Sequence, residues 1–127
     1  MKKIIATTHA PGAIGPYSQG VRMKDLIMTS GQLPIDPVSE TIPDGIEAQT
    51  RQSLKNIEAV LAAECSGMDM VIKTTVFLKD MNDFASMNTV YGEFFSEGNY
   101  PARSAVQVAK LPKDALIEIE AIAFVKD

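Results

Sequence analysis

The residue whose type and setting most suggest chemistry is Arg103, which lies in a run of mostly small and apolar residues from Pro101 to Val108. A guanidinium buried there without a partner would cost several kcal/mol, so it needs an acidic partner or an anionic ligand. Its planar fork of N–H donors matches a small carboxylate in a bidentate arrangement. Two interpretations stay open: an ion pair with Glu118 or Glu120 across the sheet, which the pattern alone favours, and a clamp for a small organic acid.

Glu118 and Glu120 are the other candidates for chemistry. They are two residues apart in a strand predicted at residues 116–125, so both carboxylates point to the same face. A carboxylate in this position can orient or deprotonate a water molecule, or it can neutralise a neighbouring cation. Alternation along the strand does not separate the two glutamates, and either could handle the water.

Other kinds of site are disfavoured by what the sequence lacks. One histidine, His9, and one cysteine, Cys65, are too few for a structural zinc site, and HExxH, P-loop and GxGxxG motifs are absent. The segment 15–20 does not have the Gly-x-Ser-x-Gly spacing of a nucleophile elbow. We therefore expect no metal, no nucleotide cofactor and no serine nucleophile.

Length and composition limit the classes of protein further. The 127 residues are 46% hydrophobic and 22% charged, which suits one domain, residues 1–127, with a substantial core. Twelve Lys and Arg against 16 Asp and Glu give a formal charge of −4, which opposes binding to nucleic acid. No apolar run reaches the roughly 20 residues of a membrane helix, and no export signal is recognisable. We expect a cytoplasmic protein.

The strands that must position these side chains are predicted from apolar alternation and turn residues. They are expected at residues 4–6, 17–23, 26–29, 70–78, 102–109 and 116–125. A tight hairpin turn is expected at Lys24 and Asp25. Alternation places Arg103 on the same face as Ala105 and Gln107.

Two amphipathic helices are predicted between the strands. The first begins after Asp44, which has the spacing of a capping box with Glu47. Its apolar stripe consists of Ile46, Ala48, Leu54, Ile57, Val60 and Leu61. The second begins near Asn82 and stops near Gly98. It would bury Phe84, Met87, Val90, Tyr91 and Phe94, of which Tyr91 and Phe94 are interpreted as core residues.

This order of elements predicts an α+β fold, a mixed sheet with two helices on one face. Ile122 and Phe124 lie on the same side of the last strand as the two glutamates, so neither side of that strand is purely polar. Two helices cover only one face of a sheet, and the second apolar face needs a partner. We therefore predict a homo-oligomer with this face packed between subunits.

Five segments together resemble the motifs of the RidA family, also called YjgF. They are residues 14–20 (IGPYSQG), 29–34 (TSGQLP), 71–80 (VIKTTVFLKD), 101–104 (PARS) and 117–121 (IEIEA). The resemblance runs from about Ile4 to the end of the chain. It implies a chorismate-mutase-like subunit in a homotrimer, with the sheets in a central barrel, the helices outside and three clefts between subunits.

The resemblance also implies a reaction and the residues that perform it. The family contains the 2-iminobutanoate/2-iminopropanoate deaminases, which hydrolyse reactive enamine and imine intermediates to 2-keto acids and ammonia without cofactor or metal. By this resemblance Arg103 would bind the substrate carboxylate, and Glu118 would hold the hydrolytic water. The cleft would be lined by Tyr17, Ser30, Gly31 and Asn88. Many deaminase members carry Cys after Arg-Ser, where this chain has Ala105.

A trimer that binds 2-keto acids for regulation, without turnover, is the alternative. Arg103 suits both functions, whereas Glu118 favours the enzyme, because a second carboxylate would repel a bound anion. Ribonuclease activity, which has been ascribed to relatives, has little support from an acidic chain without a basic stripe. The sequence leaves open the preferred imino acid and any chaperone activity.

Overall fold

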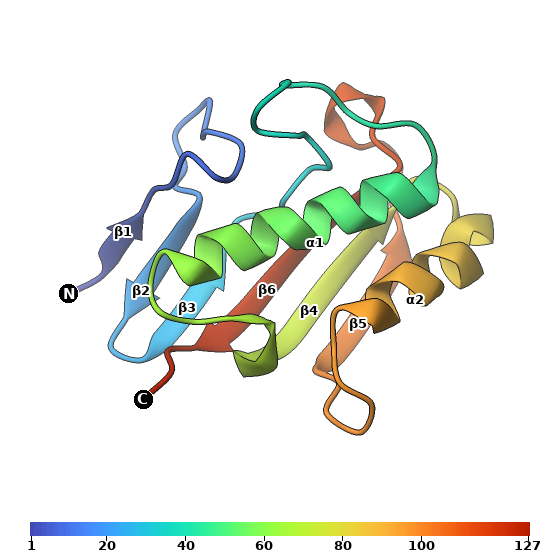
Figure 1. Cartoon of the computed structure of the whole chain (residues 1–127). Coiled ribbons are helices and arrows are strands. Elements are labelled where there is room, and N and C mark those ends of the chain that lie inside the picture. Colours follow the sequence, from blue (N-terminus) through green and yellow to red (C-terminus); the bar gives the residue numbers. More distant parts are fainter.

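A six-stranded sheet forms one layer of the computed structural model, which describes residues 1–127 (Figure 1). The strands are β1 (Lys3–Ile5), β2 (Gly20–Met23), β3 (Leu26–Thr29), β4 (Val71–Leu78), β5 (Ala102–Gln107) and β6 (Ile117–Phe124). Their order across the sheet is β1-β2-β3-β6-β4-β5, which makes β5 an edge strand. Strands β4 and β5 are parallel and all other neighbours are antiparallel. The predicted mixed sheet is confirmed.

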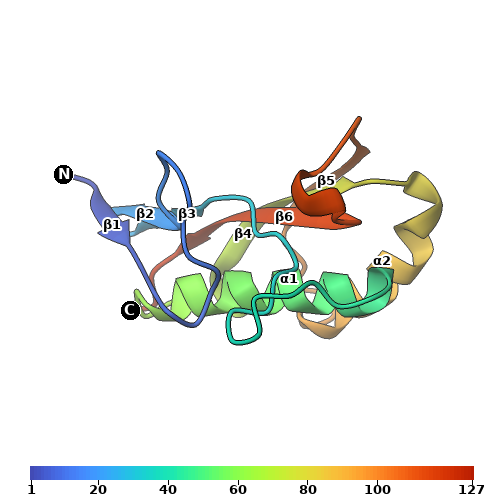
Figure 2. The same cartoon turned by 90° about the horizontal axis from the view of Figure 1, so that it is seen from above.

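Helices α1 (Ile46–Ala62) and α2 (Phe84–Glu93) form the second layer. Figure 2 shows both helices on the same side of the sheet, as predicted. The core between the two layers contains Ile27, Leu54, Ile57, Val60, Leu61, Val76, Leu78, Met87, Ile117, Ile119 and Ala123. No helix combines the length and the apolar character needed to cross a membrane.

Neither α1 nor α2 covers the opposite face of the sheet (Figure 2). Large apolar side chains are exposed on it, with exposed fractions of 52% for Ile4, 47% for Met28 and 40% for Phe124. Each of these side chains alternates along its strand with a buried residue of the core. Glu118 and Glu120 lie on the same uncovered face, because they alternate with buried Ile117 and Ile119. We call this surface the open face.

The start of α1 differs from the prediction. Gly45, not Asp44, occupies the N-cap position, and no side chain caps the helix. Gly45 has a φ of 88°, a left-handed conformation that glycine adopts at little cost, and its carbonyl accepts the first helical hydrogen bond from Gln49. The capping box at Asp44 and Glu47 is therefore wrong.

The buried side of α1 is also more polar than the apolar stripe predicts. Ala48 is exposed, whereas Thr50, Ser53 and Asn56 are buried. The Thr50 hydroxyl donates to the carbonyl of Ile46 at 2.7 Å, and the Asn56 amide donates to the loop that precedes the helix. These partners let Thr50 and Asn56 occupy buried positions that a search for apolar residues misses, whereas the buried Ser53 hydroxyl has no partner.

Several strands and helices are shorter than predicted. Strand β2 begins at Gly20 instead of residue 17, because the preceding chain forms a loop held by Gln19. A short 3-10 turn at Met81–Asp83 precedes α2, which ends at Glu93, before Gly98. The hairpin turn at Lys24 and Asp25 is confirmed.

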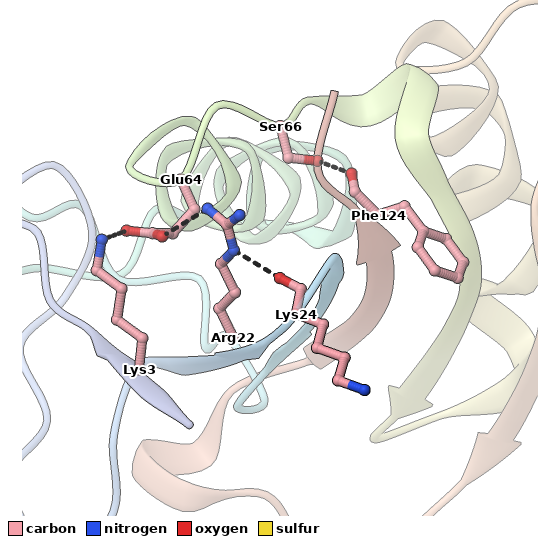
Figure 3. A network of polar contacts seen from close by, with 6 residues as sticks. All are labelled: Lys3, Arg22, Lys24, Glu64, Ser66 and Phe124. Atoms are coloured by element: carbon pink, nitrogen blue, oxygen red, sulfur yellow. Dashed lines mark hydrogen bonds and ion pairs between the residues drawn. The ribbon is translucent and has the colours of Figure 1, made fainter. Parts of the chain in front are cut away.

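Ion pairs tie the end of α1 to the first two strands (Figure 3). The carboxylate of Glu64 accepts from Lys3 Nζ at 3.0 Å and from Arg22 Nη1 at 3.2 Å. These contacts, the hydrogen bond from Lys3 above all, lower the pKa of the Glu64 carboxyl below its ordinary value. Beside them, Ser66 Oγ donates to the Phe124 carbonyl at 2.7 Å and fixes the end of β6.

Candidate functional site

Arg103 lies on the helix side of the edge strand β5, where it faces α2. Its Nη1 donates to Asn88 Oδ1 at 2.6 Å. Because arginine has only donors, Asn88 must present its oxygen to the guanidinium, and its Nδ2 donor remains without a partner in the chain. Both residues line an open cavity of about 430 Å³, together with Tyr91, Gly92, Tyr100 and Pro101. We call this group the arginine half-site.

Two aromatic rings of α2 lie against the guanidinium. Arg103 Cζ is 4.8 Å from the ring centre of Tyr91 and 5.4 Å from that of Phe84. Contacts of this length are cation–π interactions, which stabilise a guanidinium without using its hydrogen-bond donors. The remaining N–H groups of Arg103 have no partner within the chain and are available to an anion.

The ion pair of Arg103 with Glu118 or Glu120 does not form. Arg103 is opposite Thr74 on β4, and Glu118 is opposite Phe77 on the other side of the same strand. Two strand spacings and three residues of offset separate the two backbones by about 14 Å. Arg103 also contacts α2, whereas the glutamates lie on the open face, so the side chains are on opposite sides of the sheet.

Glu118 is partly buried on the open face beside Gly31. A Cβ atom at Gly31 would lie 2.8 Å from Glu118 Cδ and 2.9 Å from Oε2, so the carboxylate rests against a backbone that only glycine leaves open. Burial, together with the neighbouring charge of Glu120, raises the pKa of the Glu118 carboxyl above its ordinary value.

The loop and strand end around Gly31 also carry Tyr17 and Ser30. Tyr17 and Gly31 line one small cavity of about 60 Å³. The Ser30 hydroxyl donates to the carbonyl of Ser18, and the Ser30 N–H donates to the carbonyl of Gln19 at 2.9 Å. The glutamate half-site is defined as Tyr17, Ser30, Gly31 and Glu118. The chain thus brings the expected site residues together in two groups, which it keeps apart.

Sequence reasoning missed the part that aromatic residues play beside Arg103. Phe84, Asn88 and Tyr91 are at positions i, i+4 and i+7 of α2 and therefore lie on one face of the helix. That spacing is present in the sequence, where it predicts Tyr91 only as a core residue. Tyr100 lines the same cavity and directly precedes the segment 101–104, and this position in the sequence is the signal that points to it. No group of His, Cys, Asp and Glu side chains is arranged to hold a metal ion.

Comparison with known proteins places the chain in one family. The family profile described as Endoribonuclease L-PSP matches residues 7–125. All five segments on which the resemblance rests lie within this range. The chain therefore belongs to this family, which is the RidA/YjgF family.

Individual relatives are similar over nearly the full chain. The 2-iminobutanoate/2-iminopropanoate deaminase of Salmonella typhimurium is 53% identical over 125 residues, which are 97% of this chain and 98% of the relative. The protein of the same name from Escherichia coli strain K12 is 54% identical with the same coverage. The crystal structure of E. coli TdcF with bound serine superposes with a TM-score of 0.92 at 50% identity, over 98% of this chain and 99% of that chain. The structure of the E. coli YjgF gene product gives 0.93 at 52% identity, with the same coverage.

Proposed function

We propose that this protein hydrolyses 2-imino acids, such as 2-iminobutanoate and 2-iminopropanoate, and their enamine forms to 2-keto acids and ammonia. The observation that carries the proposal is the arginine half-site, where Arg103 and Asn88 offer only N–H donors to an open cavity. Such a site is suited to a carboxylate. Relatives at 53–54% identity over 97% of the chain are deaminases named for these two substrates, which supports the same reaction here.

Arg103 would hold the substrate by its carboxylate. In a 2-imino acid the carboxylate is bonded to the electrophilic imine carbon, so an anchored carboxylate fixes that carbon in the cleft. Water adds to the C=N bond and ammonia leaves, with a 2-keto acid as the product. Free imines already hydrolyse in water, so the rate gain from positioning suffices without metal, cofactor or thiol. Ala105, in place of the cysteine of many relatives, is compatible with this mechanism.

Glu118 would hold the attacking water, accept its proton and return a proton to the nitrogen, so that the C–N bond breaks and ammonia leaves. A carboxylate with a raised pKa is a stronger proton acceptor than an ordinary glutamate, as long as it is ionised. Glu120 is exposed, whereas Glu118 is partly buried and fixed against Gly31. This difference favours Glu118 over Glu120 as the group that positions the water.

The site would be completed between copies of the chain, in a homotrimer of chorismate-mutase-like subunits with sheets inside and helices outside. The two half-sites lie on opposite sides of the sheet, so one chain does not bring them to one ligand. The open face, with Met28 and Phe124 exposed, offers the apolar surface that such an assembly buries. Tyr17, Ser30 and Gly31 would then line the cleft on the side of Glu118, and Asn88 on the side of Arg103.

The decisive assay generates the imine in the presence of the protein. A dehydratase that acts on threonine or serine releases 2-iminobutanoate or 2-aminoacrylate, and the formation of keto acid is followed with and without this chain. The wild-type protein should accelerate keto-acid release, and Arg103→Ala should abolish the acceleration while its circular dichroism remains native. Normal turnover by a folded Arg103→Ala variant would contradict the carboxylate clamp. Light scattering should give the mass of a trimer.

Glu118→Gln separates the enzyme from a regulator that only binds 2-keto acids. For the enzyme, the variant should bind pyruvate at least as well as the wild type, because a negative charge beside the anion is removed, and should hydrolyse the imine slowly. Equal losses of binding and turnover would indicate that Glu118 has only a structural role. Pyruvate binding by the wild type without any acceleration of hydrolysis would support the regulator.

A further inference from the structure

The two aromatic residues beside Arg103 pack in or against the core and also contact the guanidinium, a contact that the proposed chemistry by itself does not use. Phe84 and Tyr91 are two turns apart on α2, and Asn88 lies between them. All three touch the guanidinium: two rings at 5.4 and 4.8 Å, and an amide oxygen at 2.6 Å. The two rings are called the aromatic clamp. One face of one helix thus determines where the guanidinium lies.

Tyr91 is itself held by the strand next to Arg103. Its hydroxyl is 2.6 Å from the Thr74 hydroxyl, and both side chains are buried, with exposed fractions of 5% and 1%. Thr74 is also the residue directly opposite Arg103 in the pairing of β4 and β5. The Tyr91 phenol is protonated at neutral pH even at its ordinary pKa, and burial raises this pKa further.

We propose that Phe84, Tyr91 and Thr74 are positioning residues that orient the Arg103 guanidinium for the substrate carboxylate. The inference rests on the proposed function and assigns new residues to it. An unrestrained arginine loses side-chain entropy when it binds an anion, and a guanidinium already held by contacts with two rings loses less. The rings leave the N–H donors free, whereas an acidic partner would occupy them.

The clamp predicts a change in substrate affinity without an equal change in the chemical step. Tyr91→Leu removes one ring from the guanidinium, and it should raise KM for the imino acid and Kd for pyruvate about tenfold. Because the water and its acceptor are elsewhere, kcat should stay within about twofold. Tyr91→Phe keeps the ring but loses the bond to Thr74, so it should recover most of the affinity.

A matched control comes from Phe95, whose ring centre lies 4.9 Å from that of Tyr91. Phe95→Leu removes an aromatic residue from the same cluster but none of the rings that contact Arg103. It should lower the melting temperature to a similar extent and leave KM and Kd unchanged. Phe84→Leu is a second test of the clamp, because Phe84 is only partly buried and its loss is less able to disrupt the core.

The experiment measures KM and kcat with the in situ imine and Kd for pyruvate by calorimetry. The clamp would be overturned if folded Tyr91→Leu or Phe84→Leu kept wild-type affinity. It would also be overturned if Phe95→Leu lost as much affinity as these variants. Neither result would contradict the deaminase function. If the wild type bound pyruvate without hydrolysing imines, the proposed function would fail. The clamp would then be tested by comparing Kd for pyruvate between the wild type and the variants. A wild type that bound no pyruvate would overturn the clamp as well.

Discussion

Replacing Gly31 with alanine should displace the carboxylate of Glu118 and little else. The new methyl carbon would be 2.8 Å from Glu118 Cδ and 3.1 Å from Cγ, with Oε2 at 2.9 Å. Non-bonded carbon atoms rest at about 3.5–4.0 Å, so the carboxylate has to retreat by roughly 0.7–1.2 Å. Gly31 does not have a left-handed φ, and alanine is therefore compatible with its backbone.

The structural cost of this displacement is small and its effect on the reaction is large. Glu118 can move to a less favourable rotamer, which costs about 0.5–1.5 kcal/mol, or roughly 2–6 °C in melting temperature. A misplacement of about 1 Å in a catalytic arrangement can lower the rate about 100-fold. We therefore expect Gly31→Ala to fold, to bind pyruvate and to lose about 100-fold in kcat.

The assay follows keto acid released from the in situ imine, with calorimetry for pyruvate binding and circular dichroism for folding. Gly12→Ala is the matched control, because a Cβ at Gly12 meets no atom within 4 Å, and it should retain wild-type kcat. Full activity in Gly31→Ala would show that the position of the Glu118 carboxylate does not matter, and the proposed role of Glu118 in holding the water would be refuted.

Three further predictions concern stability. The raised pKa of Glu118 means that its ionised form destabilises the fold at neutral pH. Glu118→Gln should therefore raise the melting temperature by about 1–3 °C at pH 7. This gain in melting temperature should become smaller as the pH falls towards 4, where the wild-type carboxyl is protonated. The lowered pKa of Glu64 has the opposite effect, because its ionised form stabilises the fold. This stabilisation is fully present above the ordinary carboxyl pKa and is lost as the pH falls through the lowered pKa. Glu64→Gln should therefore cost about 1 kcal/mol at pH 7, and a loss that persisted at pH 3 would contradict the ion pairs. Asn56→Ala removes the buried donor that serves the partly buried carbonyls of Leu33 and Ile35, and it should cost about 2–3 kcal/mol, measured as a lower urea midpoint at unchanged slope.

Much of the fold could be predicted because its signals are local. The hairpin at Lys24 and Asp25, the helix that carries Tyr91, and the alternation of β6 all follow from patterns within a few residues. The start of α1 could not be predicted in this way. Asp44 has the right chemistry for a cap, but the left-handed Gly45 turns the chain one residue later.

The predicted ion pair of Arg103 with Glu118 or Glu120 is wrong for a different reason. Alternation tells which residues of one strand share a face, but it does not tell how the faces of two separate strands correspond. That correspondence depends on strand order and register, which place Arg103 opposite Thr74 and Glu118 opposite Phe77. The residue types therefore suggested an ion pair that the geometry of the sheet excludes within one chain.

The same geometry is the reason why the proposed reaction would depend on the association of several copies of the chain. A sheet is one residue thick, and side chains on its two faces point away from each other. A 2-imino acid has its carboxylate and its imine carbon on adjacent atoms, so the groups that bind one and activate water for the other must converge within a few ångströms. Arg103 is on the edge strand β5 and Glu118 is on the open face, and the proposed trimer would bring a second copy to both surfaces. In the proposed trimer every interface would join one arginine half-site to one glutamate half-site, and dissociation would remove all of the sites at once.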